Sequence, residues 1–234
     1  MIEAVIAQVP ASLATFGGRI AAGPSRPGAR SLSTLRARAA FDAVINAFGE
    51  PFGPVDRRAV VSLWTQSYLA ALIIPYFTAL SRLGQALPIA FDRTGFECDE
   101  TGTVSRFLLF DADRPPAGSE AALVPLVDGH LRPFFDLCHA HSGLSRRVLW
   151  GNAGVAADVT LHALNLDAGL AAPIAAQAQA CLSRCDADAF DRCPLAQAFA
   201  AGERRRRVCC MRYRLPGVAS CGGACPIDHS KAPC

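Results

Sequence analysis

Apolar residues recur with the spacing of one helical face over much of the chain. This pattern predicts five helices, over residues 35–48, 55–84, 121–141, 145–164 and 173–185. Ser33 is the predicted N-cap of the first helix. The second helix is apolar on most faces, which predicts a buried helix with a break or kink near Pro75. Pro125 and Pro133 interrupt the third.

Two short apolar and aromatic runs between the second and third helices follow a different pattern. Residues 87–93 and 103–113 are separated by a link that contains glycine and aspartate, which predicts a β-hairpin. Residues 1–30 are rich in alanine, glycine and proline, and residues 17–31 predict a loop or flexible linker. The pattern as a whole predicts an α+β fold that is predominantly helical, with a small antiparallel β element and a cysteine-rich C-terminal loop segment.

The composition is typical of one compact domain. Of the 234 residues, 51% are hydrophobic, which is enough to bury a large core. The formal net charge is only +3, so the charge gives no argument for nucleic-acid binding, and we expect no nucleic-acid partner. Lys231 is the only lysine, and the abundance of arginine indicates a compositional bias more than a binding function.

The first residues do not have the pattern of a secretory signal. Glu3 is acidic and no basic residue precedes the N-terminal apolar stretch, so we expect a reducing compartment. The longest apolar run, residues 68–80, is shorter than the roughly 20 residues that span a bilayer. We therefore expect a cytoplasmic protein, with peripheral contact at the inner face of the membrane left open.

Four cysteines near the C-terminus form the most distinctive motif. Cys209 and Cys210 are adjacent, ten residues separate Cys210 from Cys221, and three residues separate Cys221 from Cys225. Glycines within this segment allow the backbone to fold closely around a small centre. Four thiolates suit either a structural zinc ion or an iron–sulfur cluster, and the spacing alone does not choose between them. A disulfide network is a third interpretation, which a reducing compartment disfavours.

Residues 204–226, which include these cysteines, resemble the C-terminal segment of the FhuF-like ferric-siderophore reductases. That family holds a [2Fe–2S] cluster with a Cys-Cys pair, ten residues, a third Cys, two residues and a fourth Cys. The adjacent pair and the ten-residue interval agree with the family pattern, whereas the last interval is three residues here. Residues 62–80 and 147–157 resemble the helical body of the family more weakly.

The resemblance implies a [2Fe–2S] cluster ligated by Cys209, Cys210, Cys221 and Cys225. It also implies a ferric-siderophore reductase, in which one electron passes from the cluster to siderophore-bound Fe(III). Reduction releases iron because Fe(II) is a softer ion that hard oxygen donors hold less well. The partners would be a ferric siderophore and an electron donor such as reduced ferredoxin or a flavoprotein.

On this interpretation the chain divides into three parts. A flexible N-terminal segment covers 1–32, a siderophore-binding α+β body covers 33–200, and the [2Fe–2S]-binding segment covers 201–234. The alternative is a non-redox protein that binds a siderophore or another partner and uses the four cysteines for a structural zinc site.

Arginines flank the cysteines and are candidates for binding or tuning. Arg212 and Arg214 alternate around Tyr213, so they share a face beside the cysteines if the backbone there is extended. Cationic charge stabilises the reduced cluster and raises its potential, and it also attracts an anionic siderophore. The arginine run 204–207 is interpreted equally well as a solvated surface.

Other cysteines and histidines have simpler interpretations. Cys181 and Cys185 lie on one predicted helical face and suit packing better than metal binding. His139 and His141 alternate, which would bring both to one side of an extended segment as hydrogen-bonded side chains. His229 would be a substitute ligand if the longer final interval disables the last cysteine.

The remaining distinctive residues are predicted to pack in the core. Cys98 and Cys138 are isolated and behave as small apolar residues. Trp64 and Tyr68 share a helical face with apolar neighbours. The tripeptide at 150–152, Trp-Gly-Asn, predicts a helix entry or a tight turn packed against the core.

Overall fold

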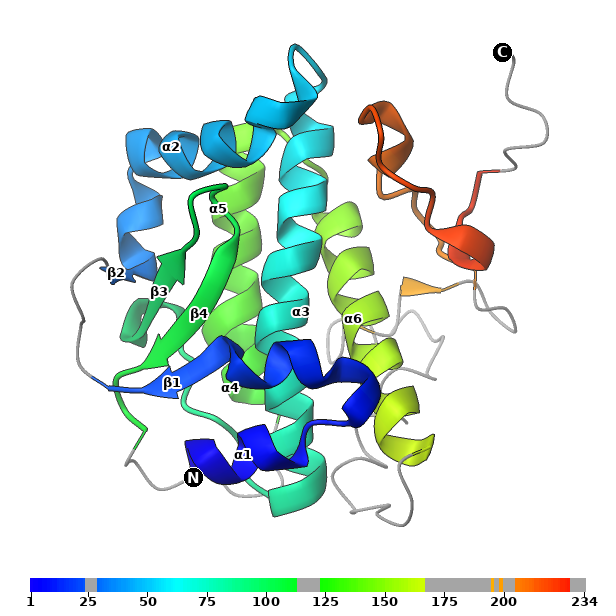
Figure 1. The fold of residues 1–234 in the computed structure, drawn as a ribbon. Coiled ribbons are helices and arrows are strands. Elements are labelled where there is room, and N and C mark those ends of the chain that lie inside the picture. Colours follow the sequence, from blue (N-terminus) through cyan, green and yellow to red (C-terminus); the bar gives the residue numbers. More distant parts are fainter. Residues whose placement is uncertain (24–28, 113–122, 167–194, 196–197, 200–204, 228–234) are drawn as a thin grey trace.

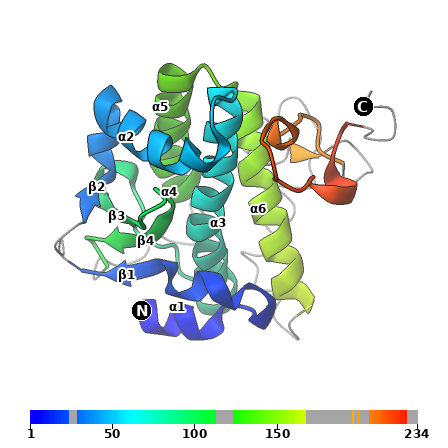
Figure 2. The same ribbon diagram turned by 45° about the horizontal axis from the view of Figure 1, so that its top comes forward.

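The computed structural model describes residues 1–23, 29–112, 123–166, 195, 198–199 and 205–227 (Figure 1). Its central element is helix α3 (Arg57–Leu83), which lies between a small sheet on one side and helix α6 (Arg146–Leu166) on the other (Figures 1 and 2). The fold is α+β and predominantly helical, as the sequence predicts.

Helix α3 is buried along most of its length and forms the core of the protein. It begins after Asp56, whose carboxylate accepts a hydrogen bond from the Arg58 N–H, and it ends at Gly84 with a left-handed φ of 65°. The helix continues through Pro75, so of the predicted break or kink the break is wrong. Pro75 removes only one backbone donor, and the apolar side chains packed around this buried residue hold the helix together.

Helix α3 is also the one helix in the described part of the chain with the length and apolar character of a membrane span. Its most apolar stretch of 18 residues has a mean hydropathy of 1.4, and 78% of that stretch is buried inside the protein. The buried core helix of a globular protein passes the same test, because the test uses only length and composition.

The other helical elements surround α3, with α6 packed along it. They are α1 (Ile2–Gln8), η1 (Ala11–Arg19), η2 (Leu32–Arg36), α2 (Arg38–Gly49), η3 (Glu50–Phe52), η4 (Phe91–Arg93), α4 (Val124–Leu126), η6 (Val127–Leu131), α5 (Arg132–Ser142), η8 (Arg212–Arg214) and η9 (Gly222–Ala224). Helix α6 confirms the prediction over 145–164. The helix predicted over 173–185 lies outside the described residues.

Two helix predictions differ in detail. The third helix is one continuous helical run in which a π-helical turn, η6, joins α4 to α5. Pro125 does not interrupt it, because it lies in the first turn of the run, where no N–H donor is needed. Pro133 does not interrupt it either and lies just after the π-helical turn. Ser33 is not the N-cap of α2. A 3-10 turn precedes that helix, and Ser31 caps this turn by accepting from the Ser33 N–H.

The sheet has four strands in the order β1-β4-β3-β2. Strands β3 (Thr94–Cys98) and β4 (Val104–Leu109) form the predicted hairpin, but its first strand is not over 87–93. Strand β2 (Arg30–Ser31) adds to β3 in the antiparallel sense. Strand β1 (Ile20–Ala22) pairs in parallel with β4, so the sheet is mixed where an antiparallel element was predicted.

The N-terminal residues are folded, contrary to the predicted loop. Helix α1 buries Ile2 and Val5, and strand β1 buries Ile20 in the main core. This segment is held by contacts with α3 and with β4, which lie far away in the sequence.

Candidate metal centre

The predicted cysteine motif lies in residues 205–227, here called the cysteine segment. It packs beside the N-terminal half of α3 and against α6 (Figures 1 and 2). Its backbone turns at Met211, Gly217 and Gly222, which have φ values of 62°, 72° and 60°. The two ends of the segment meet, because the Arg206 N–H donates to the Ala224 carbonyl at 2.9 Å. The segment thus forms a closed loop.

All four predicted cysteine ligands lie within this loop. Cys210 and Cys225 are buried, and Cys209 and Cys221 are half-buried. The Sγ atoms of Cys210 and Cys221 are 3.9 Å apart, which is about twice the length of a disulfide bond, and both are free thiols. The Cys209 sulfur accepts a hydrogen bond from the Met211 N–H at 3.2 Å.

The crowding of the sulfurs changes their proton affinity. Burial first, and then the nearby sulfurs of Cys210 and Cys225, together raise the pKa of Cys221 to about 12. Burial also raises the pKa of Cys209, although the hydrogen bond from Met211 opposes that rise. A group of crowded thiols of this kind is stabilised as thiolates when a metal cation takes the place of their protons.

The donor set fits a sulfur-ligated metal centre. Tetrahedral metal–sulfur bonds of about 2.3 Å place two sulfurs about 3.8 Å apart, close to the Cys210–Cys221 separation of 3.9 Å. Within the described residues, no three His, Cys, Asp or Glu side chains already form a complete metal site. The segment therefore holds the four thiols in one loop but does not bring three of them into the geometry of a metal site. The chemistry of four cysteines fits a zinc ion or a [2Fe–2S] cluster.

A buried polar network joins the cysteine segment to the helices. The Ser62 hydroxyl on α3 donates to the Cys210 carbonyl at 2.7 Å. The Asn152 amide on α6 donates to the Ser62 and Thr65 side chains at 3.2 Å, and its oxygen accepts from the Arg206 guanidinium. Burial lowers the pKa of Arg206, whereas the nearby cysteine sulfurs raise it.

Sequence reasoning did not identify this network. Asn152 was predicted at a helix entry or turn, but it lies inside α6 with its side chain buried. Arg206 belongs to an arginine run that was interpreted as surface, yet it is only 4% exposed. The available signal was a group of polar residues, Ser62 and Thr65, in the middle of an otherwise apolar helix.

Arg212 and Arg214 lie in the 3-10 turn η8 and not on the extended backbone that would give them a shared face, and both side chains have protein partners. Arg212 donates to the Gln66 side chain on α3 at 2.6 Å. Arg214 forms a 2.5 Å ion pair with Asp56, the N-cap of α3. Hydrogen bonds from Arg58 first, and from Arg214, lower the pKa of Asp56 to about 2. The two arginines thus help to hold the segment on α3, and their predicted contact with substrate stays a prediction.

The other sequence candidates lie elsewhere. His139 and His141 are on helix α5, not on an extended segment, and hydrogen-bond to the Leu144 and Arg36 carbonyls. Cys98 is half-buried and Cys138 is buried, as predicted for packing residues. Three further candidates, Cys181, Cys185 and His229, lie outside the described residues.

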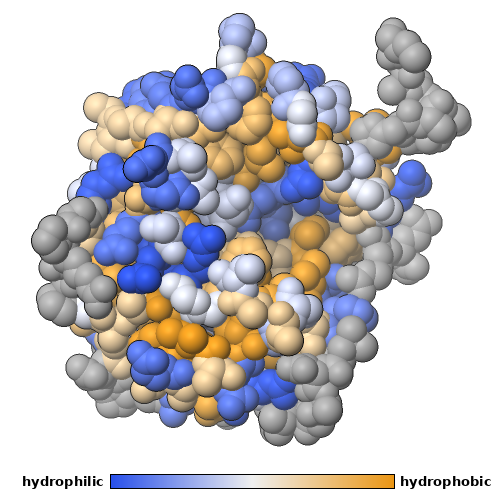
Figure 3. Space-filling view, viewed as in Figure 1, coloured by the Kyte–Doolittle hydropathy of each residue, from blue (hydrophilic) through white to orange (hydrophobic). Residues whose placement is uncertain are grey.

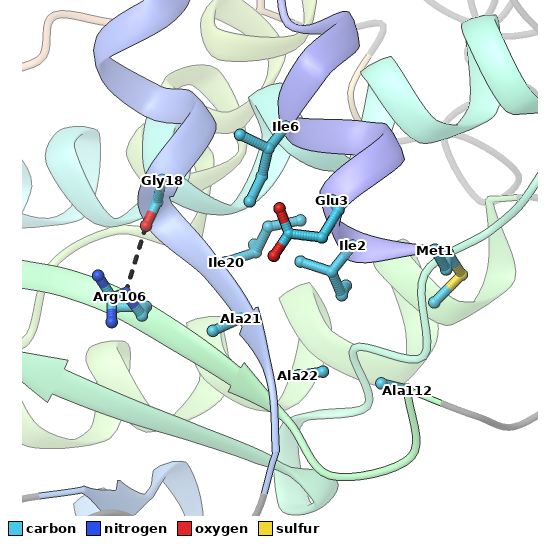
Figure 4. A pocket seen from close by; sticks show the side chains of 10 residues that line it. All are labelled: Met1, Ile2, Glu3, Ile6, Gly18, Ile20, Ala21, Ala22, Arg106 and Ala112. Atoms are coloured by element: carbon cyan, nitrogen blue, oxygen red, sulfur yellow. Dashed lines mark hydrogen bonds between the residues drawn. The ribbon is translucent and has the colours of Figure 1, made fainter.

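A cavity of about 460 Å³ lies in another part of the molecule (Figure 4). It is lined by apolar residues of α1 and β1, with the Glu3 carboxylate and the Arg106 guanidinium at its edge. Figure 3 shows hydrophobic side chains exposed over this part of the surface. A second cavity, of about 370 Å³, lies between α2 and the start of α3. Neither cavity is lined by the cysteine segment, so we do not assign either to the metal centre.

Comparisons with known proteins identify relatives of the chain. The sequence model of the family described as ferric iron reductase FhuF-like transporter matches residues 62–208, and thus ends one residue before Cys209. A protein of Escherichia coli (strain K12) named ferric siderophore reductase is 26% identical over 172 residues. That match covers 71% of this chain and 65% of the relative, so the chain spans slightly less than two thirds of the relative's length.

Proposed function

Because this chain belongs to the FhuF-like ferric iron reductase family, we propose that it is a ferric-siderophore reductase. The reaction is a one-electron reduction of siderophore-bound Fe(III), and it frees iron because oxygen donors hold Fe(II) less well. The observation that carries the proposal is the closed loop of four cysteines packed on the matched helical body. The name of the E. coli relative supports the same substrate class.

We assign Cys209, Cys210, Cys221 and Cys225 as the ligands of a [2Fe–2S] cluster. When bound, such a cluster supplies single electrons at a potential that the protein tunes through charge and hydrogen bonds. Gly222 and Gly223 occupy the longer final interval, and Gly222 has a left-handed φ of 60°. This turn lets Cys225 reach the other thiols in spite of the additional residue.

The exposed side of the cysteine segment is suited to charged partners. Arg205, Arg207, Tyr213 and Arg214 are exposed there. A cationic surface of this kind attracts an anionic siderophore, and it also attracts an acidic electron donor such as reduced ferredoxin or a flavoprotein. Such donors are cytoplasmic, so we place the reaction in the cytoplasm or at the inner face of the membrane.

The test is to purify the protein without oxygen and to assay iron, sulfide, zinc and visible absorption on one sample. Fe(II) released from a ferric siderophore is then followed with a coloured Fe(II) chelator. We expect Cys210→Ser to lose the visible absorption and to lower the rate of reduction at least about 100-fold, since changes around a metal's ligands alone cost about 10- to 100-fold. Cys98→Ser, which alters a half-buried thiol on β3, is the control and keeps both.

Two outcomes would contradict the proposal. One is a Cys210→Ser protein that keeps its colour and its reductase activity. The other is a colourless wild-type protein with one zinc ion and no sulfide, which would support a non-redox protein that binds a siderophore or another partner through a zinc-stabilised segment.

A further inference from the structure

Arg206 is a buried cation without a carboxylate partner in the described part of the chain. Its side chain is 4% exposed, and no ion pair joins it to an aspartate or glutamate of these residues. Its hydrogen bonds go instead to neutral oxygens, those of Asn152 and of the Val208 carbonyl. Burying a guanidinium costs free energy of folding unless a negative charge compensates it. We therefore expect an anion close to Arg206.

The groups that can become negative next to Arg206 are the cysteine sulfurs. Those of Cys210, Cys221 and Cys209 all lie close enough to affect its pKa. Two neighbouring arginines of the same run differ from it, because Arg205 and Arg207 are exposed and bond to the Cys225 and Phe199 carbonyls. Water screens their charge, whereas the charge of Arg206 acts through the protein interior.

Two residues of helix α6, Gly151 and Asn152, lie next to the Arg206 guanidinium. The Asn152 oxygen accepts from Arg206 Nη2, while the Asn152 amide is fixed by Ser62 and Thr65. Residue 151 is a glycine, and a Cβ atom at this position would meet only Arg206 Nη2, at 3.5 Å. The helix thus leaves room for about one methyl group directly beside the buried charge.

The geometry points to Arg206 as the residue that sets the reduction potential of the cluster, with Asn152 as the positioning residue that holds it beside the sulfurs. This inference rests on the proposed function. Reduction adds one negative charge to the centre, and a buried cation stabilises that added charge, so Arg206 raises the potential.

Two variants test this role by different routes. Arg206→Gln removes the charge but keeps an amide that can donate to Asn152. Gly151→Asp keeps the Arg206 residue and introduces a carboxylate at the position whose Cβ would lie 3.5 Å from Arg206 Nη2. We expect each variant to weaken the affinity of the cluster for the electron at least tenfold, which is about 59 mV for a one-electron couple. The potential is measured by redox titration of the visible absorption, independently of siderophore reduction.

Matched controls separate the effect of the buried Arg206 charge on the potential from the effect of an exposed charge nearby. Arg207→Gln removes a neighbouring exposed charge, and Gly151→Ala fills the same space without a charge. We expect both to keep the wild-type potential within about threefold in electron affinity. Arg206→Lys keeps the charge and is expected to restore most of the potential that Arg206→Gln loses.

The outcomes distinguish this inference from the proposed function. A wild-type cluster whose potential changes neither in Arg206→Gln nor in Gly151→Asp would overturn the role of Arg206 and leave the reductase assignment intact. The same holds if Arg207→Gln lowers the potential as much as Arg206→Gln does. If Arg206→Gln fails to fold, Gly151→Asp against Gly151→Ala decides the question. A wild-type protein without iron and sulfide would overturn both proposals.

Discussion

His130 lies fully buried in the core and bonds through both of its ring nitrogens. Its Nδ1 contacts the Ile89 carbonyl, and its Nε2 lies 2.7 Å from the Tyr68 hydroxyl. A carbonyl can only accept, so Nδ1 carries the proton and Nε2 accepts from Tyr68. Aromatic rings of Phe91, Phe107 and Phe134 surround the imidazole and leave no anion to stabilise a second proton. Burial therefore lowers the pKa of His130 to about 4.

This lowered pKa makes the stability of the fold depend on pH. Above about pH 6.5 the imidazole is neutral in both the folded and the unfolded chain, so it contributes nothing to the pH dependence. Below that pH only the unfolded chain takes up the proton, and we expect the free energy of unfolding to fall by up to about 3 kcal/mol as the pH approaches 4. Urea unfolding of the wild type and of His130→Gln between pH 7 and pH 4.5 measures the effect. A wild type with the same pH dependence as His130→Gln would contradict it.

At the scale of elements, helix α6 uses two glycines for different purposes. A Cβ atom on Gly154 would lie 2.5 Å from the Leu195 carbonyl oxygen and 2.4 Å from Ala198 Cβ, so this glycine lets a distant part of the chain approach the helix closely. Gly151 has open space beside it, with only Arg206 Nη2 within 4 Å. The two positions should therefore respond in opposite ways to the same substitution.

We expect Gly154→Ala to lower the free energy of unfolding by about 1–3 kcal/mol, because the new methyl group collides with backbone that cannot move freely. Gly151→Ala is expected to be neutral or to stabilise the protein by up to about 1 kcal/mol, since alanine favours the helix and finds room there. Thermal or urea unfolding of the two variants gives both values. Equal effects at the two positions would show that the approach of residues 195 and 198 does not matter.

Sequence analysis predicted well the elements whose apolar pattern is continuous along the chain. Helices α3 and α6 follow from long apolar patterns, and tertiary packing then carries α3 through Pro75. The strand over 94–98 was missed because Gly95 breaks the apolar run. A Cβ atom there would lie 2.7 Å from the Phe110 ring, so a larger residue at this position would displace that ring. Strand β1 was missed because its partner residues in β4 lie more than eighty positions away.

At the scale of the whole molecule, the cysteine segment is joined to α3 across most of the sequence. Cys210, Arg212 and Arg214 contact Ser62, Gln66 and Asp56, respectively. The sequence motif predicted the four cysteines as the ligands of one centre, and the structure places all four in the cysteine segment. The motif could not predict that the segment packs on α3, because these contacts join positions about 150 residues apart. Ser62, Asn152 and Arg206 all fall within the span that the family model matches.

The hydrogen bond between Ser62 and the Cys210 carbonyl should control how often the cysteine segment opens. Ser62→Ala removes the hydroxyl that donates to the Cys210 carbonyl and leaves that carbonyl buried without its partner, at a cost of about 1–3 kcal/mol. The Asn152 amide loses the Ser62 hydroxyl as an acceptor but keeps the Ser62 carbonyl and the Thr65 hydroxyl. The loss therefore falls mainly on the attachment of the cysteine segment, so residues 205–227 should open more often while the rest stays folded. In the metal-free protein we expect amide hydrogen exchange of these residues to become on the order of tenfold faster.

Ser81→Ala is the matched control, because both serines are buried on α3 but differ in bonding. The Ser81 hydroxyl has no hydrogen-bond partner among the described residues, so its removal takes away an unsatisfied group and should leave stability unchanged or slightly higher. If Ser62→Ala and Ser81→Ala gave the same exchange over 205–227, the Ser62 hydrogen bond would not hold the segment. Faster exchange in Ser62→Ala alone would show that the cysteine segment depends for its position on a helix about 150 residues earlier in the sequence.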